Sequence, residues 1–393
     1  MKNLFINFLV FTVSVCLAFL AAEMFVRLFI KIPVEVNEPL KRSIHESSDN
    51  VKLRYKLTPN ASNFEHGVWN RINSYGFRDE NPLEKPKGTT RIIFLGDSVV
   101  YGDSIELADT VPQQLEKLFQ SKGNKVDIMN FGVAGYETEQ EVEFFKELGL
   151  QFKPDIVIVG YCLNDSNHGS GEILWFHTEL KRRMKLNQKL RLDKKILTFL
   201  YRYSKLFSYI DRKFYLQETY AFLRPYHDQS LYVYLNERNK ANRDSIGSPY
   251  RKLEQEIIEE GKRLGTRKDS IDYLMGNIGF KTDELHSSHW NISKQSLQEL
   301  MELSKQYSFK PIFVIFPIFQ EMEKYPLDSL HQFLEKETKE LGYQVIDMKD
   351  WGKELYIQYG RSKLSNDSIH FNSSGAALAA HYLYDELTRR NLV

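Results

Sequence analysis

The sequence predicts an α/β fold: a doubly wound, five-stranded parallel sheet that carries a helical insertion and follows an N-terminal transmembrane helix. Three observations predict it. From residue 91 onward, short runs of apolar residues alternate with amphipathic stretches of helical length, which is typical of a parallel sheet covered by helices on both faces. A long interruption separates the third and fourth apolar runs, and the amino end is apolar and uncharged.

The apolar stretch at the amino end runs from residue 4 to residue 22 without a charged side chain. As a helix it spans about 28 Å, close to the thickness of the hydrocarbon core of a bilayer. Only Lys2 precedes it, and Leu20-Ala21-Ala22 is a poor cleavage site, so we expect an uncleaved anchor over residues 1–32. A cleaved signal peptide is the alternative. Flanking charges leave the orientation open, because long domains translocate largely regardless of them.

The composition points to no charged or metallic partner. The 53 basic and 52 acidic residues nearly cancel, and we expect no nucleic acid partner. Cys16 and Cys162 are too few for a disulfide framework or a thiolate metal cluster. His286 and His289 have the spacing of zinc ligands but lack an evident third ligand, so we expect neither a metal nor another cofactor.

The strands and helices follow one another regularly after a lead-in segment at residues 33–90, so residues 91–393 read as one domain. The insertion covers about 166–290 and separates the third strand from the helix before the fourth. With five strands in this rhythm we expect the flavodoxin-like order 2-1-3-4-5. The predicted strands are 91–96, 125–132, 155–162, 311–316 and 343–348; the helices are 110–123, 138–149, 294–307 after Ser293 as N-cap, 326–342, and 373–390 after Asn372 as N-cap.

Chemically compatible residues follow the first three strands. In the expected order strand 1 lies between strands 2 and 3, so the segments after their carboxyl ends meet at one edge of the sheet. Ser98 follows strand 1, Gly132 and Gly135 follow strand 2, and Asn164 follows strand 3. A hydroxyl nucleophile, a glycine N–H and an asparagine amide are the parts of an oxyanion site. We expect Asp97 to be a turn or cap residue, and Gly132 to be a turn glycine.

A base for the serine is available far downstream. Asp367 and His370 lie three residues apart just before the last helix, a spacing that puts both side chains on one side of a turn. The carboxylate would hold the imidazole while the other ring nitrogen faces Ser98. The chain order Ser, Asp, His is that of the α/β-hydrolases, yet the sequence has no G-x-S-x-G elbow, so the nucleophile sits on a different turn.

These four blocks, in this order, resemble those of the SGNH or GDSL hydrolases over about residues 91–165 and 309–390. GDSVVYG at 96–102 matches the family's GDSxxxG, and Asp367 and His370 match its DxxH. The resemblance implies a catalytic triad of Ser98, Asp367 and His370. It also implies an oxyanion hole formed by Ser98, Gly135 and Asn164. The third block, usually GxND, departs from the pattern because Cys162 stands at the glycine position.

The upstream stretch NSYGFRDE, residues 73–80, resembles membrane-anchored bacterial members of the same family. This implies a single-pass protein of the inner membrane whose catalytic domain faces the periplasm. The predicted function is a serine esterase that hydrolyses an O-acyl ester, for example an O-acetyl ester, on a cell-envelope carbohydrate or lipid. One alternative is an O-acyltransferase that uses the same triad to acylate a carbohydrate. Another is a non-catalytic envelope-binding protein, against which the intact triad argues.

The insertion contains a basic and apolar stretch at residues 180–215, where twelve Lys or Arg residues stand against two Asp. Two interpretations stay open: a helix packed on the domain with a solvated basic face, or an interfacial helix on anionic lipid headgroups. Because the insertion leaves the sheet at its active-site edge, it is also a candidate lid or substrate wall. The apolar positions recur at helical spacing: Ile196, Phe199, Leu200, Tyr203, Leu206, Phe207 and Ile210.

Overall fold

The computed structural model describes residues 2–29, 44–165, 199, 203–207, 209–210, 249–278 and 290–393. The chain divides into two compact units, one of residues 1–43 and 177–236 and one of residues 44–176 and 237–393. The sheet lies in the second unit. The predicted division into anchor, lead-in segment and hydrolase domain stays a prediction.

The first unit contains helix α1 (Lys2–Phe29). The part from Ile6 to Phe29 has a mean hydropathy of 2.3 and is long and apolar enough to cross a membrane, properties that an N-terminal signal sequence shares. Near its carboxyl end, Glu23 pairs with Arg27 and accepts hydrogen bonds from the backbone N–H groups of Lys205 and Leu206. The end of α1 therefore holds part of the basic stretch of the insertion.

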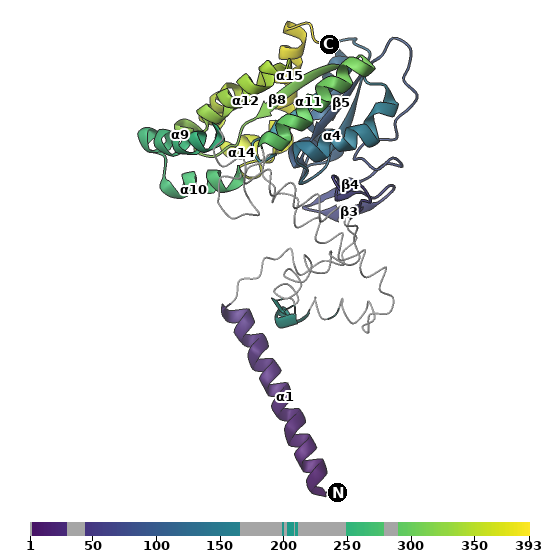
Figure 1. Ribbon diagram of the computed structural model, residues 1–393. Coiled ribbons are helices and arrows are strands. Elements are labelled where there is room, and N and C mark those ends of the chain that lie inside the picture. Colours follow the sequence, from purple (N-terminus) through teal and green to yellow (C-terminus); the bar gives the residue numbers. More distant parts are fainter. Residues whose placement is uncertain are drawn as a thin grey trace. The chain divides into compact units, whose positions relative to one another are not determined.

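The sheet in the second unit has five parallel strands in the order β6-β5-β7-β8-β9, as predicted (Figure 1). Every residue of β7, the central strand, is buried, which is expected where helices cover both faces. Gly96, the last residue of β5, pairs in register with Gly132 of β6 and Gly160 of β7. The strands are β5 (Thr90–Gly96), β6 (Val126–Gly132), β7 (Ile156–Cys162), β8 (Lys310–Phe316) and β9 (Gln344–Asp347).

Helices cover the two faces of the sheet, as the alternating pattern predicts (Figure 1). On one face lie α3 (Val111–Ser121) and α15 (Ser373–Arg389); on the other lie α4 (Thr138–Glu147), α11 (Trp290–Tyr307) and α12 (Asp328–Glu340). Asn372 caps α15 as predicted, because its side chain accepts from the N–H of Gly375. The remaining helices are α2 (Ser98–Tyr101), α9 (Pro249–Leu264) and α10 (Lys268–Asn277) of the insertion, α13 (Lys349–Tyr359) and α14 (Arg361–Leu364).

The prediction of Ser293 as the N-cap of its helix is wrong. Helix α11 begins at Trp290, and Ser293 is a buried residue inside it. The reason is tertiary packing: the indole of Trp290 contacts the rings of Tyr161 and Phe333 and donates to Glu337. This packing stabilises a helical turn at residues 290–293, so the helix begins before Ser293 although serine locally prefers the capping position.

The lead-in segment folds against the sheet as two small hairpins followed by a tight turn. The Asn73 side chain accepts from the N–H groups of Tyr75, Gly76 and Phe77, which closes the turn. The ring of Phe77 is buried 4.6 Å from that of Phe131 in β6. The hairpin strands are β1 (His45–Ser47), β2 (Tyr55–Leu57), β3 (Ser62–Glu65) and β4 (Val68–Arg71).

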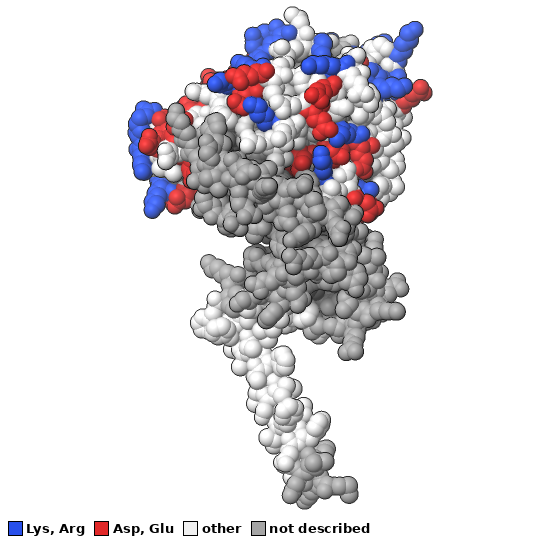
Figure 2. All heavy atoms as spheres, in the orientation of Figure 1, with Lys and Arg blue, Asp and Glu red and all other residues white. Residues whose placement is uncertain are grey.

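The surface of the sheet unit carries both signs of charge. On the visible face, Lys and Arg side chains alternate with Asp and Glu side chains over the helices (Figure 2). This distribution matches the near-zero net charge of the chain.

Two carboxyl groups lie inside this unit, close to the carboxyl end of β7. Glu141 of α4 is completely buried, and neither of its carboxyl oxygens has a hydrogen-bond partner among the described residues. Asp165 is also buried, and one of its oxygens accepts from the N–H of Cys162. Burial raises the pKa of both groups well above the ordinary value, and the nearby charge of Asp97 raises each further. We infer that both are protonated at neutral pH.

This burial predicts that stability falls as pH rises. The unfolded Glu141 carboxyl loses its proton near pH 4.5, whereas the folded one keeps it, so above that pH the unfolded state binds fewer protons. The free energy of unfolding then falls by up to about 1.4 kcal/mol per pH unit for this group. We expect Glu141→Gln to remove this part of the pH dependence, measured as thermal midpoints of the detergent-solubilised protein at pH 5 and pH 8.

Glu147→Gln is the matched control, because Glu147 is an exposed residue near the end of the same helix. The inference is contradicted if the wild type and Glu141→Gln lose the same stability between the two pH values.

Candidate active site

The turn after β5 explains the spacing of the GDSVVYG block. Asp97 is the N-cap of α2, as expected, and its buried carboxylate accepts from the N–H of Val99 at 2.8 Å. Gly102 ends the helix with φ at +79°, a left-handed conformation that favours glycine. A Cβ at Gly96 would lie 2.3 Å from the side chain of Val100. The block thus fixes Ser98 as the first residue of a short helix held tightly on the strand end.

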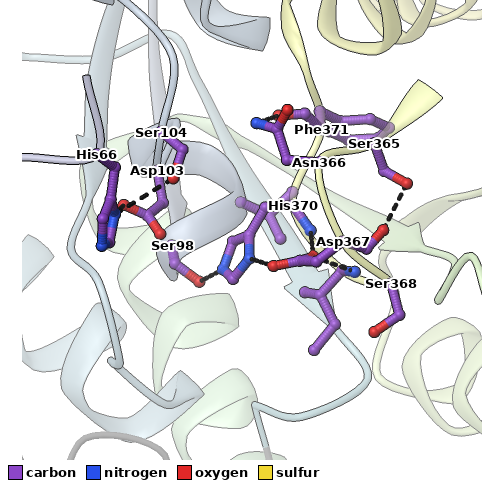
Figure 3. A network of polar contacts seen from close by, with 12 residues as sticks. His66, Ser98, Asp103, Ser104, Ser365, Asn366, Asp367, Ser368, His370 and Phe371 are labelled. Atoms are coloured by element: carbon purple, nitrogen blue, oxygen red, sulfur yellow. Dashed lines mark hydrogen bonds and ion pairs between the residues drawn. The ribbon is translucent and has the colours of Figure 1, made fainter. Parts of the chain in front are cut away.

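The structure brings Ser98, Asp367 and His370 together, although 272 positions separate the serine from the histidine. The Nε2 of His370 lies 2.8 Å from the Oγ of Ser98, and its Nδ1 lies 2.7 Å from a carboxylate oxygen of Asp367. Figure 3 shows the imidazole between the two partners. Because a carboxylate can only accept a hydrogen bond, the Nδ1 of His370 carries the proton and donates to Asp367, and the Nε2 is left to accept from the serine hydroxyl.

The Asp367 carboxylate is held in a turn of its own. It accepts from the backbone N–H groups of Ile369 and His370 at 2.7 and 2.8 Å. Partial burial acts to raise the pKa of Asp367, but these bonds and the imidazole outweigh it and lower the pKa to about 2. Burial acts to lower the pKa of His370, but the hydrogen bond and charge of Asp367 raise it overall. This pair is therefore suited to stabilise an imidazolium.

The predicted oxyanion residues lie at the same edge of the sheet as Ser98. Gly135, at φ +74°, is in the turn after β6, and Asn164 is in the turn after β7. The Asn164 side chain hydrogen-bonds to the Asp97 carboxylate, which orients the amide beside the nucleophile turn. Gly132 is more than a turn glycine: a Cβ there would lie 2.1 Å from the backbone nitrogen of Tyr101. Its small size lets α2 lie on the end of β6.

Cys162, which stands at the glycine position of the third block, fits the end of β7 and bonds to the turn that follows. Cys162 is the buried last residue of β7, and burial raises the pKa of its thiol well above the ordinary value, which makes it unreactive. Asp165 closes the turn that follows by donating its N–H to the Cys162 carbonyl and accepting from the Cys162 N–H. The glycine that packing requires is Gly160, where a Cβ would lie 2.7 Å from side chains of Phe94 and Val100.

Arg78 contacts the segment after the candidate nucleophile, a role that the sequence did not predict. It is completely buried, and its guanidinium donates to the carbonyls of Tyr101, Gly102 and Ile105 in the segment after Ser98. The same group lies 4.8 Å from the ring centre of Tyr101. In the sequence, only its position in the NSYGFRDE stretch indicated that Arg78 has a role. Arg78 fastens the lead-in segment to the nucleophile turn.

The insertion reaches the site through α10. The hydroxyl of Tyr273 hydrogen-bonds to that of Ser368, the residue after Asp367. The other residues singled out from the insertion, His286 and His289, lie outside the described residues. So do most residues of the basic stretch; Phe199, Tyr203 and Ile210, which are described, are exposed.

Part of the chain matches a known protein family. Residues 92–264 match the family of GDSL-like lipases and acylhydrolases. No curated protein matches the chain. Similar solved structures include the acetyl xylan esterase AlAXEase, at 10% identity over 76% of this chain and 99% of that one, with a TM-score of 0.37.

Two further structures are similar at the same level. A catalytic mutant of an acetylxylan esterase from Geobacillus stearothermophilus has 10% identity over 78% of this chain and 96% of that one, with a TM-score of 0.40. A putative lipolytic protein of the G-D-S-L family from Desulfitobacterium hafniense has 11% identity over 75% and 98%, with a TM-score of 0.38. At such TM-scores these structures say nothing of the substrate. By the family match, the chain is an ester-hydrolysing enzyme with a GDSL-like lipase/acylhydrolase domain.

Proposed function

We propose that this enzyme is a membrane-anchored serine esterase that removes an O-acyl group, for example an acetyl group, from a cell-envelope carbohydrate or lipid. The observation that carries the proposal is the hydrogen-bonded series Ser98, His370, Asp367, with 2.8 Å between the His370 Nε2 and the Ser98 Oγ. This is the arrangement of a nucleophile, a general base and the group that orients the base.

In the proposed reaction the Ser98 Oγ attacks the ester carbonyl carbon and its proton passes to the His370 Nε2. Asp367, which stays ionised, stabilises the imidazolium. The tetrahedral intermediate collapses when its C–O bond to the alcohol breaks and His370 protonates the leaving oxygen. Water, deprotonated by His370, then cleaves the acyl-enzyme. The alternative O-acyltransferase follows the same course to the acyl-enzyme and differs only in using a carbohydrate hydroxyl in place of water.

The oxyanion of the intermediate would be held by the N–H groups of Ser98 and Gly135 and by the Asn164 amide. These groups follow three neighbouring strands of a rigid sheet, so little reorganisation is needed as charge develops. The bond between the Asn164 side chain and Asp97 supports this role, because it fixes the amide before substrate binds.

We expect a fluorophosphonate probe to label the enzyme at Ser98 and Ser98→Ala to abolish labelling and ester hydrolysis. The physical reason is that the probe reacts only with a serine whose proton is accepted by a neighbouring base. The measurement is mass spectrometry of the labelled peptide together with p-nitrophenyl acetate hydrolysis.

Ser104→Ala is the matched control, because Ser104 lies six positions further along, is half-buried, and is bonded to His66 away from the imidazole of His370 (Figure 3). It should keep both labelling and activity. Labelling that survives Ser98→Ala in a folded protein would remove Ser98 as the nucleophile.

For Asn164→Ala we expect kcat to fall by about 10²–10³ with little change in KM, because an oxyanion donor acts in the transition state and little in the ground state. Steady-state kinetics with p-nitrophenyl acetate measures this. A loss confined to KM would make Asn164 a substrate-binding residue, and no loss would exclude it from the oxyanion site.

The proposed membrane attachment has two parts. Helix α1 would span the bilayer, with the catalytic domain on its extracytoplasmic side. Glu23 and Arg27, near the end of α1, bind backbone groups of Tyr203, Lys205 and Leu206, which would put this part of the basic stretch close to the lipid headgroups.

We expect the full-length protein to stay with membranes during alkaline carbonate extraction and to keep its amino-terminal residues. A protein beginning at Lys41 should bind anionic vesicles only at low salt, because exposed charges are screened at high salt. Replacing Lys194, Lys195, Arg202 and Lys205 by Gln should reduce that binding in co-sedimentation while leaving p-nitrophenyl acetate hydrolysis unchanged.

A mature protein that lacks α1 would show a cleaved signal sequence. A truncated wild type that stays in the supernatant at low salt would show that the basic stretch does not bind lipid.

A further inference from the structure

A pocket of about 460 Å³ opens beside the candidate triad, within the size range of small-molecule sites. One wall is α10 of the insertion, through Ser270 and Tyr273. Another part of the lining is the segment that leads into the final helix, with Arg361 and Asn366 to Ser368, the last three of which Figure 3 labels. The pocket therefore joins the insertion to the loop that carries Asp367.

The lining of the pocket combines polar and apolar surface. Besides its charged residues it presents the hydroxyls of Ser270 and Ser368 and the amides of Gln320 and Asn366, and its one large ring is that of Tyr273. The hydroxyl of Ser270 already donates to Glu321 and that of Ser368 is bonded to Tyr273, so the groups left for a ligand are the amides of Gln320 and Asn366. An acyl chain would leave these amides without partners, which is unfavourable. A molecule with several hydroxyl groups satisfies them, and the ring edge suits its C–H groups.

Two Arg and two Asp side chains line the pocket, so its charges balance, but they are not all paired. Arg267 pairs with Asp269 at 2.5 Å, and Asp367 is paired with His370. Arg361 forms no side-chain ion pair or hydrogen bond with any described residue, and it is exposed on the short helix α14. A guanidinium of this kind offers two parallel N–H donors, which match a carboxylate or a phosphate group.

We propose that this pocket is a subsite for the alcohol part of the ester substrate, and that the substrate is a polyhydroxylated molecule bearing a carboxylate or phosphate group, which Arg361 binds. This rests on the proposed esterase function of Ser98. One imidazole ring and two hydrogen bonds separate the Ser98 Oγ from the Asp367 carboxylate at the pocket wall. In this proposal Ser98 takes the acyl group, and the alcohol part of the ester lies in the pocket.

The test uses acetyl esters of three related alcohols with the full-length enzyme in detergent: methyl glucoside, which is neutral, glucuronic acid and glucose 1-phosphate. We expect kcat/KM for at least one anionic ester to exceed that for the neutral ester by about tenfold. This factor corresponds to the lower end of the free-energy range for a hydrogen bond to a charged group, because Arg361 is exposed. Arg361→Gln should abolish this advantage through KM, because the contact is remote from the reacting carbonyl. The anion is identified by which ester has the higher kcat/KM, that of glucuronic acid or that of glucose 1-phosphate.

Lys363→Gln is the matched control. It removes one positive charge from the same short helix, but Lys363 does not line the pocket. It should leave the preference for the anionic ester unchanged, and Arg361→Lys should retain part of it. Hydrolysis of p-nitrophenyl acetate should be the same in the wild type and in Lys363→Gln.

Equal hydrolysis of the neutral and both anionic esters by the wild type would overturn the proposal while leaving the esterase function in place. An equal loss of the preference in Lys363→Gln would also overturn it, because the effect would then be one of general charge. A wild type that hydrolyses no ester at all, p-nitrophenyl acetate included, would instead overturn the proposed function, and this subsite with it.

Discussion

The close packing of α2 on the carboxyl ends of three strands is the constraint on which the site depends. Gly96, Gly132 and Gly160 stand in register on β5, β6 and β7, and a Cβ at any of them would meet neighbouring atoms at 2.7 Å or less. Val100 meets two of these glycines and the Tyr101 backbone meets the third. Without side chains at these positions the helix sits on the sheet, and its first residue points toward the loops after the other strands. The position of the Ser98 hydroxyl is thus set by backbone packing in the centre of the domain.

Buried polar groups hold this arrangement from two sides. Arg78 binds three carbonyls of the segment after the nucleophile, so losing it would leave buried acceptors unpaired, which is costly. On the other side, Asp97 caps α2 and bonds to the Asn164 side chain. One carboxylate therefore ties the nucleophile turn to the turn after β7. Burial raises the pKa of Asp97, and it raises those of the other buried acids nearby, Glu141 and Asp165, well above the ordinary values.

The insertion between β7 and α11 contributes a helix to the surroundings of the candidate triad. Its helix α10 forms one wall of the pocket beside Asp367 and is bonded to the loop after Asp367 through Tyr273 and Ser368. Parallel sheets commonly hold catalytic groups on strand ends and vary specificity in the connections. The pocket combines polar and apolar surface, and the amides of Gln320 and Asn366 in its lining suit the hydroxyl-bearing alcohol proposed above.

The sequence by itself determined the strand order, because continuous apolar runs and right-handed crossovers leave few alternatives, and it singled out Ser98, Asp367 and His370 through their residue types and order. It failed at Ser293, where the packing of Trp290 overrides a local capping preference. Only the tertiary structure gave Arg78, Gly132 and Arg361 their places. Each of these residues contacts others that are distant in the chain. Arg78 binds carbonyl groups, Gly132 lies against the backbone of Tyr101, and Arg361 lines a pocket together with residues of α10. Local patterns encode which elements form, whereas contacts between elements arise only when the chain is packed.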